Sequence, residues 1–182
     1  TEPDPITINA AVSDVSCNGG TDGAIDITVI GGNGGFSYVW TGSGVIINNE
    51  DQINLAAGSY DVSVTDSEGC VASLSNITVN EPALLNLAIN IPSDLSCNGD
   101  NDGIIDGAVT GGTPPYEVEL IETGETINLL SDGATYTFTE QIAGTYNVQV
   151  TDANGCVDSG ATSIREPGAL AMSINGDVLL CN

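Results

Sequence analysis

The stretch that decides the fold occurs twice, as GSYDVSVTDSEGC at residues 58–70 and as GTYNVQVTDANGC at residues 144–156. In both copies a tyrosine and two valines alternate with polar residues. A period of two is typical of a β-strand that has one face buried and one face in water. The Asp-x-x-Gly sequence that follows predicts a tight turn, because aspartate accepts nearby backbone N–H bonds and glycine adopts a positive φ without strain.

A second block also recurs, as CNGGTDGAID at residues 17–26 and as CNGDNDGIID at residues 97–106. The copies of this block lie 80 residues apart, whereas the copies of the block at residues 58–70 lie 86 residues apart. About six residues are therefore inserted between the two blocks in the second copy, and we expect them in a loop, where insertions are tolerated best. The chain is thus a tandem repeat.

The dipeptide Glu-Pro marks the repeat boundaries, because it recurs at Glu2–Pro3, Glu81–Pro82 and Glu166–Pro167. Both residues favour extended backbone, so each pair predicts a stiff junction and a semi-rigid rod of repeats. The predicted divisions are the tail of a preceding repeat at 1–5, a first repeat at 6–82, a second repeat at 83–167 and the start of a truncated third repeat at 168–182. We expect the parent protein to continue on both sides.

Apolar runs bounded by Gly, Asn and Asp predict strands in both copies and almost no helix. In the first copy the predicted strands lie near Ile6–Val12, Ile25–Val29, Phe36–Thr41, Val45–Ile47, Tyr60–Val64 and Val71–Val79. In the second copy they lie near Leu87–Ile91, Ile104–Thr110, Tyr116–Ile121, Tyr136–Thr139, Thr145–Thr151 and Val157–Ile164. This pattern predicts an all-β fold of two tandem immunoglobulin-like β-sandwich modules.

Trp40 stands in one of these predicted strands, at the position that Leu120 takes in the second copy. We predict that Trp40 belongs to the core, since a leucine replaces it in the other copy. The alternative is an exposed aromatic side chain that binds a ligand.

Two cysteines fall in each full repeat, and a fifth, Cys181, falls in the truncated third. From their equivalent positions we predict one bond within each module, Cys17 with Cys70 and Cys97 with Cys156, and no partner for Cys181 within the chain. Each bond would close a loop of roughly 50 residues or more and stabilise the fold by about 4 kcal/mol through chain entropy. Free thiols or a metal site are the alternative, which the lack of histidine and of Cys-x-x-Cys spacing disfavours. Disulfides predict an oxidising compartment and therefore export.

The motifs that carry a family resemblance are Cys-Asn-Gly-x-x-Asp-Gly at residues 17–23 and 97–103, Gly-Gly-x-Pro-Pro-Tyr at residues 111–116, and the blocks at residues 58–70 and 144–156, followed by Glu-Pro. In combination they closely resemble the SprB repeat, which builds very large cell-surface adhesins of gliding bacteria. The resemblance implies an extracellular array on the bacterial cell surface that is exported by the type IX pathway and attaches cells during gliding. The first copy departs from it, with Asn33–Phe36 in place of Thr-Pro-Pro-Tyr, which predicts a different turn there.

The charge of the chain excludes several partners. It has 25 acidic residues, one basic residue (Arg165) and no histidine, which gives a net charge of −24. Nucleic acids and anionic lipids are bound through lysine and arginine, so neither is expected as a partner. A content of 41% hydrophobic residues favours a folded chain over a disordered one, and no apolar run is long enough for membrane insertion. The expected partners are neighbouring repeats of the same chain and an extracellular surface or polysaccharide.

Catalysis is not expected, because the chain has neither histidine nor lysine to act as a base, and its prominent acids lie in turn motifs that both copies share. Calcium is the candidate ligand, since carboxylates gather near a glycine-bearing loop in each copy. These carboxylates are Asp22, Asp26, Asp100, Asp102 and Asp106. The alternative is that they form turns on a solvated acidic face, because the terminal glutamate of an EF-hand loop is missing.

Two functions without catalysis follow from the sequence. In the first, the repeats are stalk and surface-contact modules of a secreted adhesin that serves attachment and gliding motility. In the second, they are spacers or ligand- or carbohydrate-binding modules appended to a secreted enzyme. An exposed aromatic or polar cleft would favour the second, and continuous stacking of acidic modules would favour the first.

Overall fold

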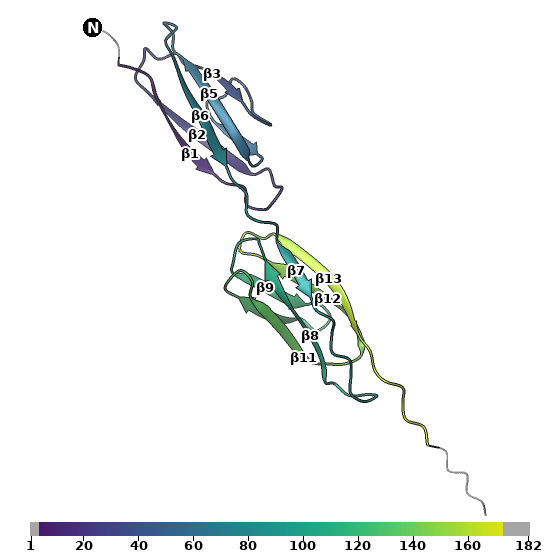
Figure 1. The fold of residues 1–182 in the computed structure, drawn as a ribbon. Coiled ribbons are helices and arrows are strands. Elements are labelled where there is room, and N and C mark those ends of the chain that lie inside the picture. The colour runs from purple at the N-terminus through teal and green to yellow at the C-terminus, as the bar shows by residue number, and fades with distance from the viewer. Residues whose placement is uncertain (1–3, 173–182) are drawn as a thin grey trace, which may run out of the picture.

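The structure is a computed structural model that describes residues 4–172. Its regular elements are thirteen β-strands, so the all-β prediction is confirmed. Within the described range there is no helix of the length and hydrophobicity that a membrane crossing requires. The strands form two separate sandwich-like bodies, each with a hydrophobic core of its own (Figure 1).

The N-terminal sandwich contains β1 (Thr7–Ser13), β2 (Gly23–Ile30), β3 (Ser37–Thr41), β4 (Gln52–Leu55), β5 (Gly58–Thr65) and β6 (Val71–Val79). One sheet has the order β1-β2-β4 and the other β3-β5-β6, and all pairs are antiparallel. The alternation in β5 places Tyr60, Val62 and Val64 in the core, each at most 1% exposed. The period of two read from residues 58–70 is therefore the period of the buried face.

The C-terminal sandwich contains β7 (Asn86–Ile89), β8 (Gly103–Thr110), β9 (Tyr116–Leu120), β10 (Glu125–Leu129), β11 (Thr135–Gln141), β12 (Gly144–Thr151) and β13 (Val157–Ile164). Its sheets have the orders β11-β8-β7 and β10-β9-β12-β13. Each strand of the first sandwich has a counterpart here, and the C-terminal sandwich has one additional strand, β10, at the edge of a sheet. The second copy, which has the longer segment between the repeated blocks, forms the edge strand β10 in that segment. The expectation that the insertion lies in a plain loop is therefore wrong.

Two strands were not predicted, and one predicted strand does not form. β4 and β10 were missed, because each is short and shows little alternation of apolar and polar residues. Val45–Ile47 does not form a strand but lies in a turn-rich segment. The buried side chain of Gln52 holds that segment in place, since it accepts a bond from the Ile46 N–H at 2.7 Å and donates one to the Ile46 carbonyl at 2.9 Å.

Trp40 lies in the core of the N-terminal sandwich, as predicted. Its side chain is 2% exposed, and its Nε1 donates a hydrogen bond to the Asn49 carbonyl at 2.9 Å. Leu120, its counterpart in the other sandwich, is fully buried. The alternative of an exposed binding aromatic is therefore wrong.

A tyrosine near the start of one strand ties each sandwich to the corner before that strand. The Tyr60 hydroxyl donates to the Ala56 carbonyl at 2.8 Å, and the Tyr146 hydroxyl donates to the Ile142 carbonyl at 2.9 Å. Both tyrosines are nearly completely buried, so each hydroxyl satisfies an acceptor at the corner four residues earlier. The same bond thus appears in both sandwiches.

The two sandwiches lie end to end along one axis (Figure 1). Because successive strands are antiparallel, each sandwich has two loop-bearing ends. One end carries the loop with the Cys-Asn-Gly motif, between β1 and β2 or between β7 and β8. The other end carries the Asp-x-x-Gly turn, between β5 and β6 or between β12 and β13. At the junction, the Cys-Asn-Gly end of the N-terminal sandwich meets the Asp-x-x-Gly end of the C-terminal one.

Candidate functional site: the junction between the sandwiches

The Asp-x-x-Gly turn is built around one buried carboxylate. Asp152 is 5% exposed and accepts backbone N–H bonds from Thr113 at 2.8 Å, Asn154 at 2.9 Å and Cys156 at 2.9 Å. Gly155 closes the turn at a φ of 83°, which glycine adopts without strain. The turn predicted from the sequence is confirmed, and it fixes both Asn154 and Cys156 at the end of the sandwich.

The Cys-Asn-Gly loop is held to the chain that leaves the same sandwich. The Gly19 N–H donates to the Glu81 carboxylate at 2.6 Å, and the Asn18 side chain donates to the Pro82 carbonyl at 3.0 Å. Within the loop, the Ser16 N–H donates to the Asp22 carboxylate at 3.0 Å. The Glu-Pro dipeptide thus holds the cysteine loop in place through hydrogen bonds and also forms the extended junction.

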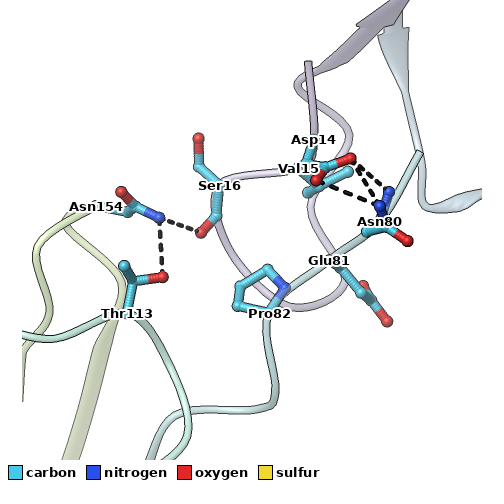
Figure 2. A pocket seen from close by; sticks show the side chains of 8 residues that line it. All are labelled: Asp14, Val15, Ser16, Asn80, Glu81, Pro82, Thr113 and Asn154. Carbon is cyan, nitrogen blue, oxygen red and sulfur yellow. Dashed lines mark hydrogen bonds between the residues drawn. The ribbon is translucent and has the colours of Figure 1, made fainter. Parts of the chain in front are cut away.

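A disulfide joins the two sandwiches at this junction. Cys17 in the Cys-Asn-Gly loop is bonded to Cys156 in the Asp-x-x-Gly turn, and their Cα atoms are 5.7 Å apart. Beside the bond, the Asn154 side chain donates to the Ser16 carbonyl at 2.9 Å, across the junction, and to the Thr113 hydroxyl at 3.2 Å (Figure 2). The covalent bond and the direct hydrogen bond together fix how one sandwich sits on the other.

The predicted pairing of Cys17 with Cys70 and of Cys97 with Cys156 is wrong in this structure. Cys70 and Cys97 are free and exposed. The reason is the length of one strand: β6 separates Cys70 from Asn80, whose carbonyl accepts the N–H of Val15 in the Cys17 loop. Nine extended residues span about 30 Å, whereas disulfide-bonded residues have Cα atoms within about 7 Å.

The same distance argument applies in the other sandwich, where β13 lies between Cys156 and the end that carries Cys97. The two cysteines of each repeat therefore lie at opposite ends of their sandwich, so a Cys-Asn-Gly cysteine meets an Asp-x-x-Gly cysteine only across a junction. The fifth cysteine, Cys181, lies outside the described residues.

A polar hollow of about 460 Å³ lies at the junction. Its lining residues are Asp14, Val15, Ser16, Asn80, Glu81, Pro82, Thr113 and Asn154 (Figure 2). No aromatic side chain lines it, and the Asp14 carboxylate is engaged with the Asn80 N–H at 2.8 Å. Small-molecule sites are lined mostly by apolar and aromatic groups, so this hollow resembles a polar gap between two domains more than a ligand site.

The structure does not bring the candidate calcium ligands together as a cluster. No group of three or more His, Cys, Asp or Glu residues in the described range is arranged to hold a metal ion. In the first copy, Asp22 is used by the Ser16 N–H, and exposed Asp26 lies in β2 about 10 Å along the strand from Gly23.

The candidates of the second copy are similarly divided. The Ser96 N–H donates to Asp102 at 3.1 Å, and the Asn90 side chain donates to Asp106 at 3.0 Å. Asp100 is exposed in the loop, where its N–H donates to the Cys97 carbonyl at 3.3 Å. Calcium binding at these residues stays a prediction, and the contacts seen are those of turn-forming aspartates.

Hydrogen bonds lower the pKa of several of these carboxyls. The Ser16 side chain and then its N–H hold the pKa of Asp22 below its ordinary value, and Ser96 acts in the same way on Asp102. For Asp66, the main cause of the lowered pKa is the Cys70 N–H, and burial acts in the opposite direction. Each of these folded-state carboxyls therefore gives up its proton more readily than the unfolded chain does.

Acid should weaken the Asp66 turn, and Asp66→Asn gives the measurement. Because the folded pKa is lowered, the stabilisation by Asp66 is fully present above the ordinary value of 3.8 and is lost as the pH falls through the folded pKa. We expect the melting temperature of the wild-type chain to exceed that of Asp66→Asn by a constant amount at pH 5 to 7 and by a shrinking amount below about pH 3.8. A difference that stays constant down to pH 2 would contradict this role. The comparison cancels the repulsion among the other acids, which both chains share.

Sequence reasoning missed three residues that make the junction. Asn154 was treated only as part of a turn, although it is the direct polar contact between the sandwiches. Glu81 and Glu166 were treated as extended linker residues, although each accepts a backbone N–H of the adjacent cysteine loop. The recurrence of Glu-Pro at the same place in each repeat was a sequence signal for a shared contact of the glutamates. In the structure, the proline that follows each glutamate also accepts a bond from the loop asparagine.

Comparisons with known proteins point to one repeat family. The SprB repeat matches the chain at residues 9–45 and 89–117, one segment in each sandwich. Among solved structures, the chain is similar to one described as "Structures of Clostridium thermocellum CbhA fibronectin(III)-like modules", at 14% identity and a TM-score of 0.37, covering 94% of this chain and 100% of that one. No curated protein matches the chain. The resemblance carried by the cysteine, glycine and aspartate motifs is thus confirmed, since the SprB repeat model matches one segment in each of the two sandwiches.

Proposed function

We propose that this chain is a force-transmitting segment of a bacterial cell-surface adhesin, in which tandem immunoglobulin-like modules form a covalently reinforced stalk for attachment and gliding. The modules are the two predicted repeats, 6–82 and 83–167, and they act without catalysis. The SprB match supports the adhesin part of the proposal. The disulfide supports an extracellular location, because such bonds persist in oxidising compartments.

The immunoglobulin-like character is supported by the order of the strands and by the buried tyrosines. In the C-terminal sandwich a three-stranded sheet and a four-stranded sheet are composed as in sandwiches of this architecture, with consecutive strands divided between them. Tyr60 and Tyr146 each bond back to the corner before their strand, which is a hallmark of these folds. Modules of this kind carry binding or spacing functions on a rigid frame.

The observation that carries the proposal is the path that a pulling force takes through the chain. Cys17 and Cys156 are 139 residues apart in the sequence but are joined directly. A force applied to the two termini therefore passes through the disulfide and leaves most of both sandwiches outside the loaded path. Only the segments before Cys17 and after Cys156, which include β1 and β13, can be drawn out.

The alternative of a carbohydrate- or ligand-binding module has less support. All eight aromatic side chains are buried or half-buried, including Trp40, so none offers an exposed platform. The hollow at the junction is polar, and its groups bond to one another. A stalk needs neither feature, whereas a ligand site is built around apolar contacts with a few polar groups.

Single-molecule stretching tests the force-transmitting role. With the disulfide intact, unfolding the chain between handles at its termini should release only the length outside Cys17–Cys156. In a reducing agent the release should grow by about 480 Å, at roughly 3.5 Å per extended residue over 139 residues. Cys97→Ser serves as the matched control and should behave like the wild type. Equal release with and without reductant would overturn the proposal.

A further inference from the structure

The Cys97 loop reproduces the Cys17 loop bond for bond. The Gly99 N–H donates to Glu166 at 3.0 Å, the Asn98 side chain to the Pro167 carbonyl at 3.0 Å, and the Ser96 N–H to Asp102 at 3.1 Å. Each of these contacts has its counterpart at the Cys17 loop. The far end of the C-terminal sandwich therefore has the same construction as the end that bears the observed bridge.

The Cys70 turn reproduces the Cys156 turn in the same way. Asp66 is 5% exposed and accepts N–H bonds from Asn33 at 3.0 Å, Glu68 at 3.0 Å and Cys70 at 2.8 Å. Gly69 has a φ of 84°, against 83° at Gly155. The free end of the N-terminal sandwich is thus built like the end that receives Cys17.

What differs between the two pairs of cysteines is their burial. Cys17 and Cys156 are half-buried against each other, whereas Cys70 and Cys97 are exposed. Beside Cys97 there is a hollow of about 350 Å³, lined by Ser96, Cys97, Asn98, Pro167, Gly168, Ala169 and Leu170. Ser96, one of its lining residues, is the counterpart of Ser16, whose carbonyl accepts the Asn154 bond in the observed junction.

We propose that Cys97 and Cys70 form further disulfides between sandwiches, Cys97 with the Asp-x-x-Gly turn of the sandwich that follows and Cys70 with the Cys-Asn-Gly loop of the one that precedes. In each case two protein thiols react with a disulfide oxidant. The sulfurs form one S–S bond, and their two electrons and two protons leave with the oxidant, which becomes two thiols. Every junction in an array would then be bridged as Cys17–Cys156 is here, which goes beyond the proposed function of this segment.

The consequence is a covalent path that is short and already extended. Cys70 and Cys97 are 27 residues apart, and the chain between them runs through β6, the Glu81–Pro82 linker and β7. Fully stretched, 27 residues reach about 95 Å. Two neighbouring sandwiches would therefore be spanned, from bridge to bridge, by a segment of which about half already lies in extended strands. Such an array would be almost inextensible as long as its bridges are oxidised.

One difference between the two Asp-x-x-Gly turns predicts a difference in the rate of bridge formation. Glu68 stands where Asn154 stands in the other turn, and a carboxylate cannot donate the bond that Asn154 gives to the Ser16 carbonyl. The joint at Cys70 therefore lacks the direct hydrogen bond of the observed junction. We expect a bridge to form more slowly when its turn carries glutamate, as the turn of Cys70 does, than when its turn carries asparagine, as the turn of Cys156 does.

The test is a chain with a third sandwich, made by joining residues 1–167 to a second copy of residues 83–182. The added copy carries Cys97→Ser and Cys181→Ser, which remove thiols that the expected bridges do not use, and Ala153→Ser, which distinguishes its Cys156 peptide by mass. After oxidation with glutathione disulfide, peptide mapping should find Cys97 of the original sandwich bonded to Cys156 of the added one, together with Cys17–Cys156. Cys97→Ser in the original sandwich is the matched control and should lose only the new bridge. A folded chain in which Cys97 stays free, or in which Cys97 is bonded to Cys156 of its own sandwich, would overturn the proposal.

The two-sandwich chain provides a second route that needs no added sandwich. With Cys181→Ser, at high protein concentration and with glutathione disulfide, it should form linear oligomers through Cys97 of one copy and Cys70 of the next. Cys70→Ser should abolish this linkage, and Glu68→Asn should raise its rate several-fold. Bonds formed only between two Cys97 or between two Cys70 residues would contradict the proposed joint.

Discussion

Removing the bridge with Cys17→Ser and Cys156→Ser together should lower the melting temperature by roughly 10–20 °C, which is the largest effect that we expect of any substitution in this chain. The bond closes a loop of 139 residues, for which the loss of chain entropy in the unfolded state corresponds to about 5 kcal/mol. A change of 1 kcal/mol shifts the melting temperature of a protein of this size by about 2–4 °C. Differential scanning calorimetry of both chains gives the measurement.

The matched control for this change is Cys97→Ser. Cys97 occupies the position of Cys17 in the other sandwich but is free and exposed, so its replacement should leave the melting temperature within about 1 °C of the wild type. If the bonds ran within the sandwiches, Cys97→Ser would destabilise the chain as much as the double variant does. Comparable losses in the two variants would therefore contradict the pairing described here.

The second large effect concerns the carboxylate that shapes the junction. Asp152→Ala should destabilise the C-terminal sandwich by about 2–4 kcal/mol, because three part-buried backbone N–H groups lose a charged acceptor. The same change releases Asn154 and Cys156 from their positions at the junction. We therefore expect incomplete formation of the bridge, seen as an increased number of titratable thiols after oxidative refolding.

Asp66→Ala separates the two consequences of losing this carboxylate. Asp66 has the same contacts in the N-terminal sandwich but lies at the end away from the junction. Its replacement should destabilise that sandwich and leave Cys17–Cys156 fully formed. If both variants reduced the bridge equally, the effect would be one of global unfolding, and the role of Asp152 in aligning the junction would be wrong.

Much of the fold could be predicted from the sequence, because apolar and polar residues alternate along a strand that has one buried and one exposed face. β6 and β13 have the predicted bounds, and the turns around Asp66 and Asp152 have the predicted construction. β4 and β10 could not be found in this way. Each has only four or five residues and little apolar alternation, so its pairing depends on neighbours that the local sequence does not specify.

The disulfide pairing was wrong for a different reason. Repetition shows that Cys17 and Cys97 have equivalent surroundings, as do Cys70 and Cys156, but it does not say whether partners lie in one sandwich or in two. The length of the predicted strand Val71–Val79 does bear on that choice, since a strand of nine residues places its two ends about 30 Å apart. Because Cys70 and the Cys17 loop lie at opposite ends of this strand, its length excludes a bond between Cys17 and Cys70.

Peptide mapping of the non-reduced chain tests the central claim most directly. Digestion with proteases that cleave after aspartate and glutamate, followed by mass spectrometry, separates the peptides that carry Cys17, Cys70, Cys97 and Cys156. The structure predicts one linked pair that contains Cys17 and Cys156, with Cys70 and Cys97 not linked to either of them. Linked pairs of Cys17 with Cys70 and of Cys97 with Cys156 would contradict the bridged junction and, with it, the stalk that is proposed from it.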